Sequence, residues 1–152
     1  RRWLPGSIGS YYLAPFSIKK GANIDGLGCG SGHPRGMEKF LRVAWEHGGD
    51  ANCDIDGDRL NPEEPSLFEE YNRPKKVTEF QHDLGELVLS RRLLNNRDVF
   101  IFAIENGFLG RHASDGLKEL VKEGKLPPQR FAISYKAWAQ DKPVPIRYNT
   151  EA

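Results

Sequence analysis

The chain has 152 residues, enough for one domain with a proper core, and its 38% hydrophobic and 28% charged residues are an ordinary balance for a soluble protein. Its apolar runs are too short to span a membrane, and two cysteines make no disulfide framework, so we expect no membrane partner and a reduced, cytoplasmic setting. The net charge is +1, but it is unevenly distributed. Residues 1–72 hold 8 basic and 11 acidic residues, whereas residues 73–152 hold 14 basic and 10 acidic residues. A basic C-terminal half is compatible with a polyanionic partner.

The first part of the chain predicts a strand, a loop and a helix in that order. Residues 7–18 are aromatic and β-branched and predict one strand or two short ones, with Pro15 at an edge or a break. Six glycines among residues 19–36 predict a long loop or a series of tight turns. Residues 36–49 place apolar side chains at helical spacing and predict an amphipathic helix ending at a glycine pair, and the acidic residues 50–65 predict a turn.

The second part of the chain predicts three helices and a hairpin. After a short linker, the apolar pattern predicts helices over 77–94, 95–107 and 111–124. Two short strands are expected near 131–136 and 144–148, joined by the turn AQDKP. This order of helices, a tight turn and a hairpin is typical of a winged helix-turn-helix.

Candidate caps and inner faces support these helices. Thr78 and Asn96 are candidate N-caps, and Gly107 and Gly124 are expected just past the ends of the second and third helices. The predicted inner faces are Val77, Phe80, Leu84, Leu87, Val88 and Leu94 on the first helix, and Ala113, Leu117, Leu120 and Val121 on the third.

The turn GFLG at 107–110 decides the fold class that we predict. A short turn containing glycine sets two helices at a large angle, and Phe108 and Leu109 would fill the corner from the inside. We therefore predict an α+β chain with a winged helix-turn-helix as its C-terminal core. An N-terminal strand, loop and helix (residues 1–65) would pack on the winged-helix region (residues 66–152) as one compact unit.

On this fold the third helix is the element that could lie in a major groove. Its outward residues are predicted to be Arg111, His112, Ser114, Asp115, Lys118, Glu119 and Lys122. The candidate nucleic-acid contacts are Arg111, His112, Ser114, Lys118 and Lys122 on the helix, with Arg130 and Lys136 on the wing and Arg147 adding charge there. Arg111 suits a phosphate because backbone N–H groups are free at a helix start.

Acidic residues on the same helix leave the kind of partner open. Asp115, Glu119 and Glu123 dilute the positive face. Lysines and glutamates spaced one turn apart are equally typical of a winged helix that docks onto a partner protein or forms a homodimer. The sequence therefore predicts either a DNA-binding module or a protein-docking module.

The glycine-rich stretch raises an alternative, a remnant of a methyltransferase that uses S-adenosylmethionine. Gly28, Gly30 and Gly32 have the spacing of a nucleotide-binding turn and precede a helix, so they are the candidate cofactor residues. The preceding strand is too short and polar for a buried parallel strand, and the later chain does not supply the further strands that such a sheet needs. We therefore expect a plain loop and no cofactor.

No pattern predicts a metal or a catalytic group. Asp54, Asp56 and Asp58 match the start of a calcium loop, but Arg59 stands where glycine is needed and Pro65 where glutamate is needed, so we expect an acidic turn. The four histidines show no metal-ligand spacing, and no nucleophile and base can be paired by spacing alone. The sequence therefore favours a protein that is not an enzyme.

Two segments together resemble a known family, the three-Cys-motif partner proteins (TcmP). These segments are Tyr11, Tyr12 and Leu13 followed by His33, Pro34, Gly36, Glu38, Lys39 and Trp45, and then SLF at 66–68 leading to GFLGRHASDGLKELVKEGK at 107–125. The resemblance covers roughly residues 11–126 and implies a winged-helix end whose partner is a radical-enzyme-like protein, and it carries over no catalytic residue. The family's methyltransferase-like N-terminal part is absent, and the sequence begins at Arg1 without an initiator Met, so we expect a fragment or a processed chain.

Overall fold

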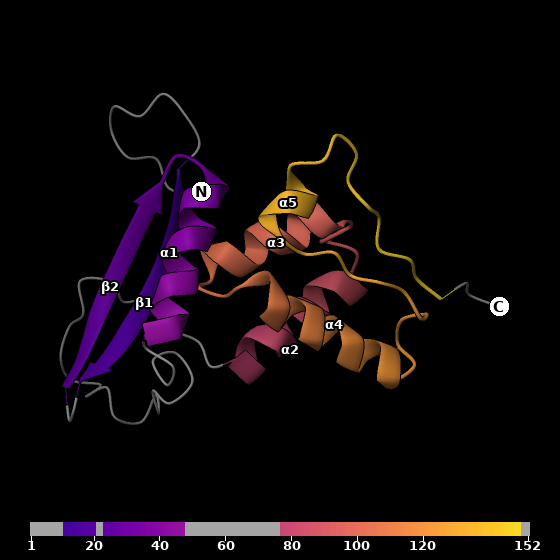
Figure 1. Cartoon of the computed structure of the whole chain (residues 1–152). Helices are drawn as coiled ribbons and strands as arrows, with labels where there is room; N and C mark the ends of the chain where they lie inside the picture. Colours follow the sequence, from indigo (N-terminus) through magenta and orange to yellow (C-terminus); the bar gives the residue numbers. More distant parts are fainter. Residues whose placement is uncertain (1–10, 21–22, 48–76, 150–152) are drawn as a thin grey trace.

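The computed structural model describes residues 11–20, 23–47 and 77–149 (Figure 1). The acidic segment with the calcium-like spacing, the glycine pair after the first helix and the predicted domain boundary at residue 65 lie outside these ranges. The elements in chain order are β1 (Tyr12–Lys20), β2 (Asn23–Ser31), α1 (Pro34–His47), α2 (Val77–Leu89), α3 (Asn96–Glu105), α4 (Gly110–Lys122) and α5 (Tyr135–Trp138).

The two strands form an antiparallel hairpin, with Tyr12 opposite Ser31 and Lys20 opposite Asn23. The predicted first strand is therefore confirmed, but the loop predicted over the glycine-rich stretch is wrong, because that stretch is β2. Glycine has a low propensity for strands, but the nine consecutive residue pairs with β1 outweigh this unfavourable local preference. Pro15 is tolerated because both strands of a two-stranded sheet are edge strands.

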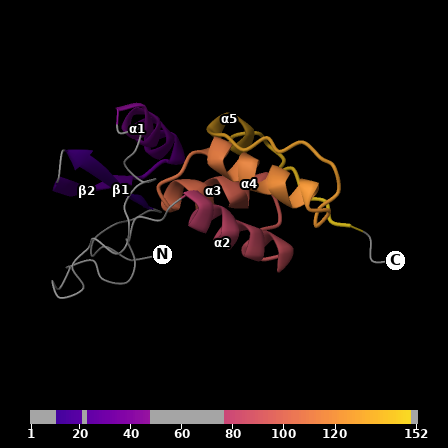
Figure 2. The ribbon, with the colours of Figure 1, turned by 90° about the horizontal axis from the view of Figure 1, so that it is seen from below.

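Helix α1 covers one face of the hairpin and joins it to the helices (Figure 2). The predicted helix is confirmed, and it starts at Pro34, whose fixed φ suits the first helical position. The ring Nδ1 of His33 accepts a hydrogen bond from the backbone N–H of Arg35 at 3.2 Å and so caps the helix. The inner face of α1 consists of Met37, Leu41, Ala44 and Trp45, all buried.

Helices α2, α3 and α4 form the predicted helix-turn-helix around stacked phenylalanines. The ring of Phe108, in the turn before α4, lies 4.3 Å from that of Phe80 on α2 and is nearly parallel to it. Phe108 and Leu109 are both buried, so the prediction that they fill the corner is confirmed. Gly107 has a φ of 84°, the left-handed geometry expected just past a helix end.

Two helix boundaries differ from those predicted. The N-cap of α3 is Asn95, whose Oδ1 accepts the N–H groups of Arg97 and Asp98, whereas Asn96 is buried inside the first turn. Helix α2 ends at Leu89 instead of residue 94, and Leu94 is exposed instead of being part of the inner face. Thr78 lies within α2 and does not cap it.

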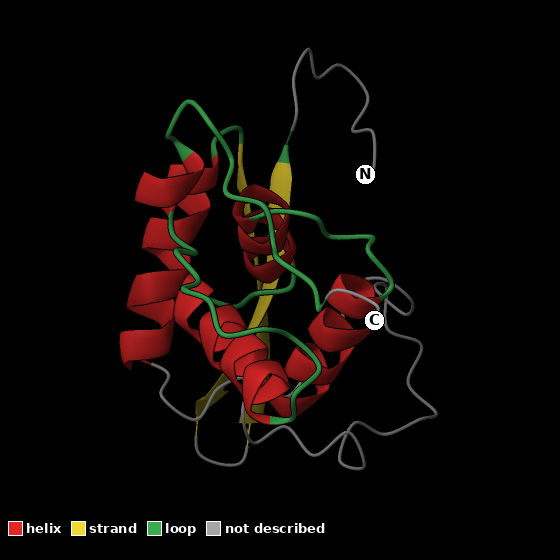
Figure 3. Ribbon diagram, turned by 90° about the vertical axis from the view of Figure 1, so that its right-hand side faces the viewer, coloured by secondary structure: helices red, strands yellow, loops and turns green. Residues whose placement is uncertain are grey.

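The C-terminal strap, which we define as residues 124–149, replaces the predicted hairpin. Residues 135–138 form the short helix α5 instead of a strand, with the Ser134 hydroxyl accepting the N–H of Ala137. The strap runs back across the helices (Figure 3) and forms a single bridge, Asn95 with Pro145. The hairpin prediction is therefore wrong.

Side-chain amides hold the strap where a regular hairpin would use backbone pairing. The Gln129 amide donates to the carbonyl of Arg147 at 2.8 Å and accepts its N–H at 2.9 Å, as an opposing peptide group would. The buried Asn96 donates to the carbonyl of Ala132 and accepts the N–H of Val144. The hydrogen bonds of these two side-chain amides therefore hold the strap in position, although it forms no continuous strands.

Gly110 at the start of α4 is the tightest contact between the helices and the strap. A Cβ at this position would overlap the carbonyl oxygen of Ile133. We predict that Gly110→Ala lowers the free energy of unfolding by about 3 kcal/mol, because a backbone carbonyl cannot turn aside as a flexible side chain can. Urea unfolding followed by circular dichroism would measure the loss. Gly32→Ala is the control, since nothing lies within 4 Å of the added Cβ, and it should change stability by less than about 0.5 kcal/mol.

Candidate nucleic-acid interface

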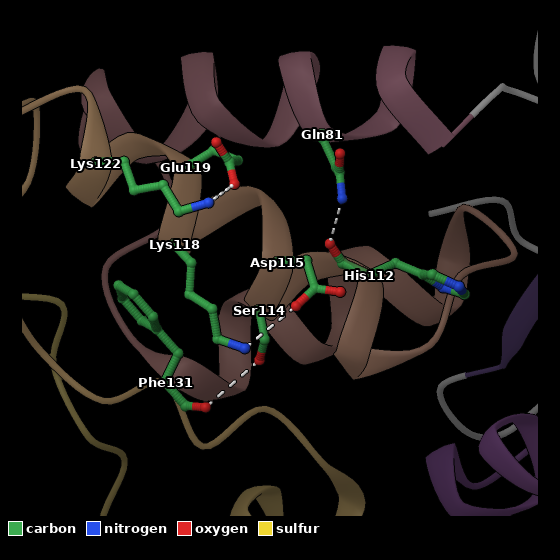
Figure 4. Close-up of polar contacts among 8 residues, drawn as sticks. All are labelled: Gln81, His112, Ser114, Asp115, Lys118, Glu119, Lys122 and Phe131. Carbon is green, nitrogen blue, oxygen red and sulfur yellow. Dashed lines mark hydrogen bonds and ion pairs between the residues drawn. The ribbon is translucent and has the colours of Figure 1, made fainter.

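The exposed face of α4 carries cations that are paired with acids on the same helix (Figure 4). The Nζ of Lys118 lies 3.2 Å from Oδ1 of Asp115, and the Nζ of Lys122 lies 2.5 Å from Oε1 of Glu119. The hydrogen bond and the charge of Glu119 raise the pKa of Lys122. Such exposed pairs contribute little to stability, but they offset the positive potential that a phosphate would meet.

Arg111 is the exception on α4. It is exposed in the first turn, and within the described residues it makes no hydrogen bond or ion pair to another side chain. The first N–H groups of a helix carry a partial positive charge that adds to the charge of a nearby guanidinium. Arg111 is therefore exposed at the helix start as predicted, and its contact with a phosphate stays a prediction.

His112 does not face outward, which corrects the prediction for this residue. Its ring lies 4.5 Å from that of Trp45 and 5.7 Å from that of Phe108. Its Nδ1 accepts the N–H of Leu109 at 3.0 Å, at the start of α4. Burial and, to a smaller extent, the charge of Arg111 together lower the pKa of His112 from 6.5 to about 4, although the charge of Asp115 partly opposes them. The ring is therefore neutral at neutral pH and occupied in packing, which does not suit a phosphate contact.

Ser114 also turns away from solvent toward the strap. Its hydroxyl donates to the carbonyl of Phe131 at 3.4 Å, and the residue is half-buried (Figure 4). The backbone carbonyl of His112 accepts a hydrogen bond from the Gln81 amide of α2 at 2.9 Å on the other side of α4. Both contacts fix α4 between α2 and the strap, so Ser114 is a support for the helix.

The strap carries an excess of exposed cations over acids. All five of its cations are exposed, and the segment contains a single acid, Asp141: the cations are Lys125, Arg130, Lys136, Lys142 and Arg147. Lys125 forms an ion pair with Glu123, just before the strap. Arg130, Lys136 and Arg147 were predicted to carry charge here, whereas Lys125 and Lys142 were missed. The scarcity of acids after residue 123 is the signal that finds them.

The candidate cofactor glycines do not form a nucleotide-binding turn. Gly28 and Gly30 pair with Pro15 and Leu13 along the hairpin, and Gly32 follows β2. A site for a dinucleotide or S-adenosylmethionine uses glycines in the turn after a parallel strand, but these strands are antiparallel. Within the described ranges, no group of three or more potential metal-ligating side chains comes together.

The residues that carry the family resemblance connect the two halves of the described structure. The indole Nε1 of Trp45 on α1 donates to the carbonyl of Gly107 in the helix-turn-helix turn at 3.0 Å. A carboxylate oxygen of Glu38 accepts the N–H of Tyr135 at the start of α5 at 3.3 Å. A Cβ at Gly36 would stand 2.5 Å from Oγ of Ser31, so a larger residue would displace the Ser31 hydroxyl from its hydrogen bonds to the His33 backbone. These positions have a structural explanation, which sequence reasoning alone did not reveal.

A comparison with protein families matches residues 54–129 to the GMT-like wHTH domain. The chain belongs to this family. The match includes α2, α3, the turn and α4, so it confirms the winged-helix class within an α+β fold. No curated protein and no solved structure matches the chain. Among the described residues, no helix of the GMT-like wHTH protein is long and apolar enough to cross a membrane.

The buried His112 predicts a pH dependence of stability. Because the folded state lowers the pKa from 6.5 to about 4, the unfolded chain binds the additional proton between these values. Stability is fully present above about pH 6.5 and falls as the pH drops toward 4. The ring is only partly buried and solvent screens its charge, so we expect a loss of about 1 to 2 kcal/mol.

Urea unfolding at about pH 7 and about pH 5 measures this loss. His112→Gln should reduce the difference between the two pH values, whereas the exposed His82→Gln should keep it. An NMR titration of His112 with an ordinary pKa would contradict the prediction directly.

Proposed function

We propose that this GMT-like wHTH protein binds nucleic acid through the phosphate backbone, with Arg111 and the strap as the main contacts. The observation that supports the proposal is the excess of exposed cations on the strap, five against one acid, and of these cations only Lys125 is ion-paired within the described residues. The Gly110 contact with Ile133 holds the strap against the helix that carries Arg111. Of the other predicted contacts, Lys118, Lys122, Arg130 and Lys136 remain in the proposed interface.

The pairing on α4 favours binding with little sequence preference. Lys118 and Lys122 would have to leave Asp115 and Glu119 before they could contact bases or phosphates. Cations that meet phosphates position a protein on a duplex but carry no sequence information. We therefore propose duplex binding that is dominated by electrostatics and sensitive to salt.

A second candidate function is protein docking through the same face of α4. The alternation of Asp115, Lys118, Glu119 and Lys122 gives a mixed surface that suits a partner with charges of both signs. The resemblance to the three-Cys-motif partner proteins would make that partner a radical-enzyme-like protein, and a second copy of this chain is the other choice. Light scattering across a concentration series tests the homodimer.

Removing two unpaired cations should weaken duplex binding. We predict that Arg111→Ala with Arg130→Ala lowers the affinity for a mixed-sequence duplex by about tenfold and reduces the slope of log K against log salt by about 2, since each phosphate contact contributes about 1. Fluorescence anisotropy over a range of salt concentrations measures both quantities. Arg42→Ala is the charge control, because Arg42 is exposed on α1 and is not one of the proposed contacts. The absence of salt-dependent binding by the wild type would refute the proposal.

Neutralising the acids of α4 should separate the two candidate functions. Asp115→Asn with Glu119→Gln leaves Lys118 and Lys122 unpaired while keeping the side-chain shapes. For phosphate binding we expect duplex affinity to rise by about tenfold, because two repulsive charges disappear. For docking through this face, the same variant should weaken the association measured by light scattering or by co-purification.

A further inference from the structure

A cluster of aromatic and basic side chains lies where α1 and α5 meet, and the proposed function does not use it. The ring cluster consists of His33, Arg35, Tyr135 and Trp138. The His33 ring lies 5.6 Å from Tyr135 and 6.0 Å from Trp138, edge-on to both, and the rings of Tyr135 and Trp138 lie 5.9 Å apart. His33 and Arg35 are exposed, and both other rings are half-buried, so solvent reaches the cluster.

The charge around the cluster is positive. The Arg35 guanidinium lies over the Tyr135 ring at 5.5 Å, and Lys39 and Lys136 are exposed on α1 and α5. The neighbouring acid, Glu38, has 13% of its side chain exposed and already accepts the Tyr135 N–H and faces Arg42. The ring cluster therefore presents aromatic surface and cations together.

Local packing holds these rings in place. Ser134 caps α5, Ala137 is buried beneath it, and α5 packs on both α1 and α3. His33 is held by the start of α1, where its Nδ1 accepts the N–H of Arg35. Rigid aromatic side chains bind with little loss of conformational entropy, which suits a stacking surface.

We propose that the ring cluster stacks an unpaired base of a bound nucleic acid, with Arg35 and Lys136 on the adjacent phosphates. Aromatic side chains beside cations are the usual surface for single-stranded nucleic acid, because every base offers a flat face. The ring cluster is continuous with the proposed interface. From Arg130 the strap passes the start of α4 at Ile133 and then forms α5, which carries two of the rings. The inference rests on the proposed function and adds a substrate class to it, a duplex with a single-stranded end.

The test compares three labelled ligands by fluorescence anisotropy: a blunt duplex, the same duplex with a short thymidine overhang, and the same duplex with an abasic overhang. We expect the thymidine overhang to bind at least about fivefold more tightly than the abasic one, since one stacked base contributes about 1 kcal/mol or more. Both overhangs carry the same phosphates, so this difference isolates stacking. It is measured on the wild type and needs no variant.

Two variants assign the gain to the ring cluster. Trp138→Leu should abolish the advantage of thymidine over the abasic overhang and leave the blunt-duplex affinity unchanged, whereas Trp138→Phe should keep most of the advantage. Equal affinities for both overhangs, or a gain that Trp138→Leu does not change, would overturn the inference while blunt-duplex binding stood. The absence of any duplex binding would overturn the proposed function itself, and a partner protein that protects Trp138 instead would assign the cluster to docking.

Discussion

The structure depends on the burial of Phe108 in the turn between α3 and α4. Its ring stacks on Phe80 of α2, contacts Trp45 of α1 and lies edge-on to His112 of α4, so three helices meet at one side chain. The hydrogen bond from the Trp45 indole to the carbonyl of Gly107 fixes the backbone of the same turn. Because the corner is closed by aromatic packing and by a hydrogen bond, the angle between α3 and α4 has little freedom, and with it the direction in which Arg111 points.

This arrangement divides α4 into an inner and an outer part. The inner part includes His112 and Ser114, which sequence periodicity placed outside and which instead pack against Trp45 and bond to the strap. On the outer part, Lys118 and Lys122 form ion pairs with Asp115 and Glu119. The cations without such partners are therefore mainly Arg111 and those of the strap. Helix α4, which the sequence predicted to lie in a major groove, therefore mainly supports the surface around it.

The candidate site was predictable to the extent that it depends on composition and local spacing. Arg111, Lys118, Lys122, Arg130 and Lys136 are exposed as predicted, because a charged side chain on a helix or loop remains hydrated unless a partner buries it. The ring cluster was not predictable, because His33 and Tyr135 are about a hundred residues apart and meet only when α5 packs on α1. Its sequence gives no sign of that contact.

The sequence by itself determined the four helices α1 to α4, their order and the turn that joins α3 to α4, since apolar periodicity, glycine after a helix end and a short apolar turn are local signals. Tertiary structure alone decided between Asn95 and Asn96 as the N-cap of α3, because either asparagine could cap the helix by local geometry. The buried Asn96 side chain forms hydrogen bonds with the strap backbone, which leaves Asn95 as the cap. Tertiary structure also made the glycine-rich stretch a strand by pairing it with β1, and it replaced the predicted hairpin with α5 and amide bonds. These outcomes depend on contacts between segments far apart in the chain, whose free energy exceeds the local preference of a few residues.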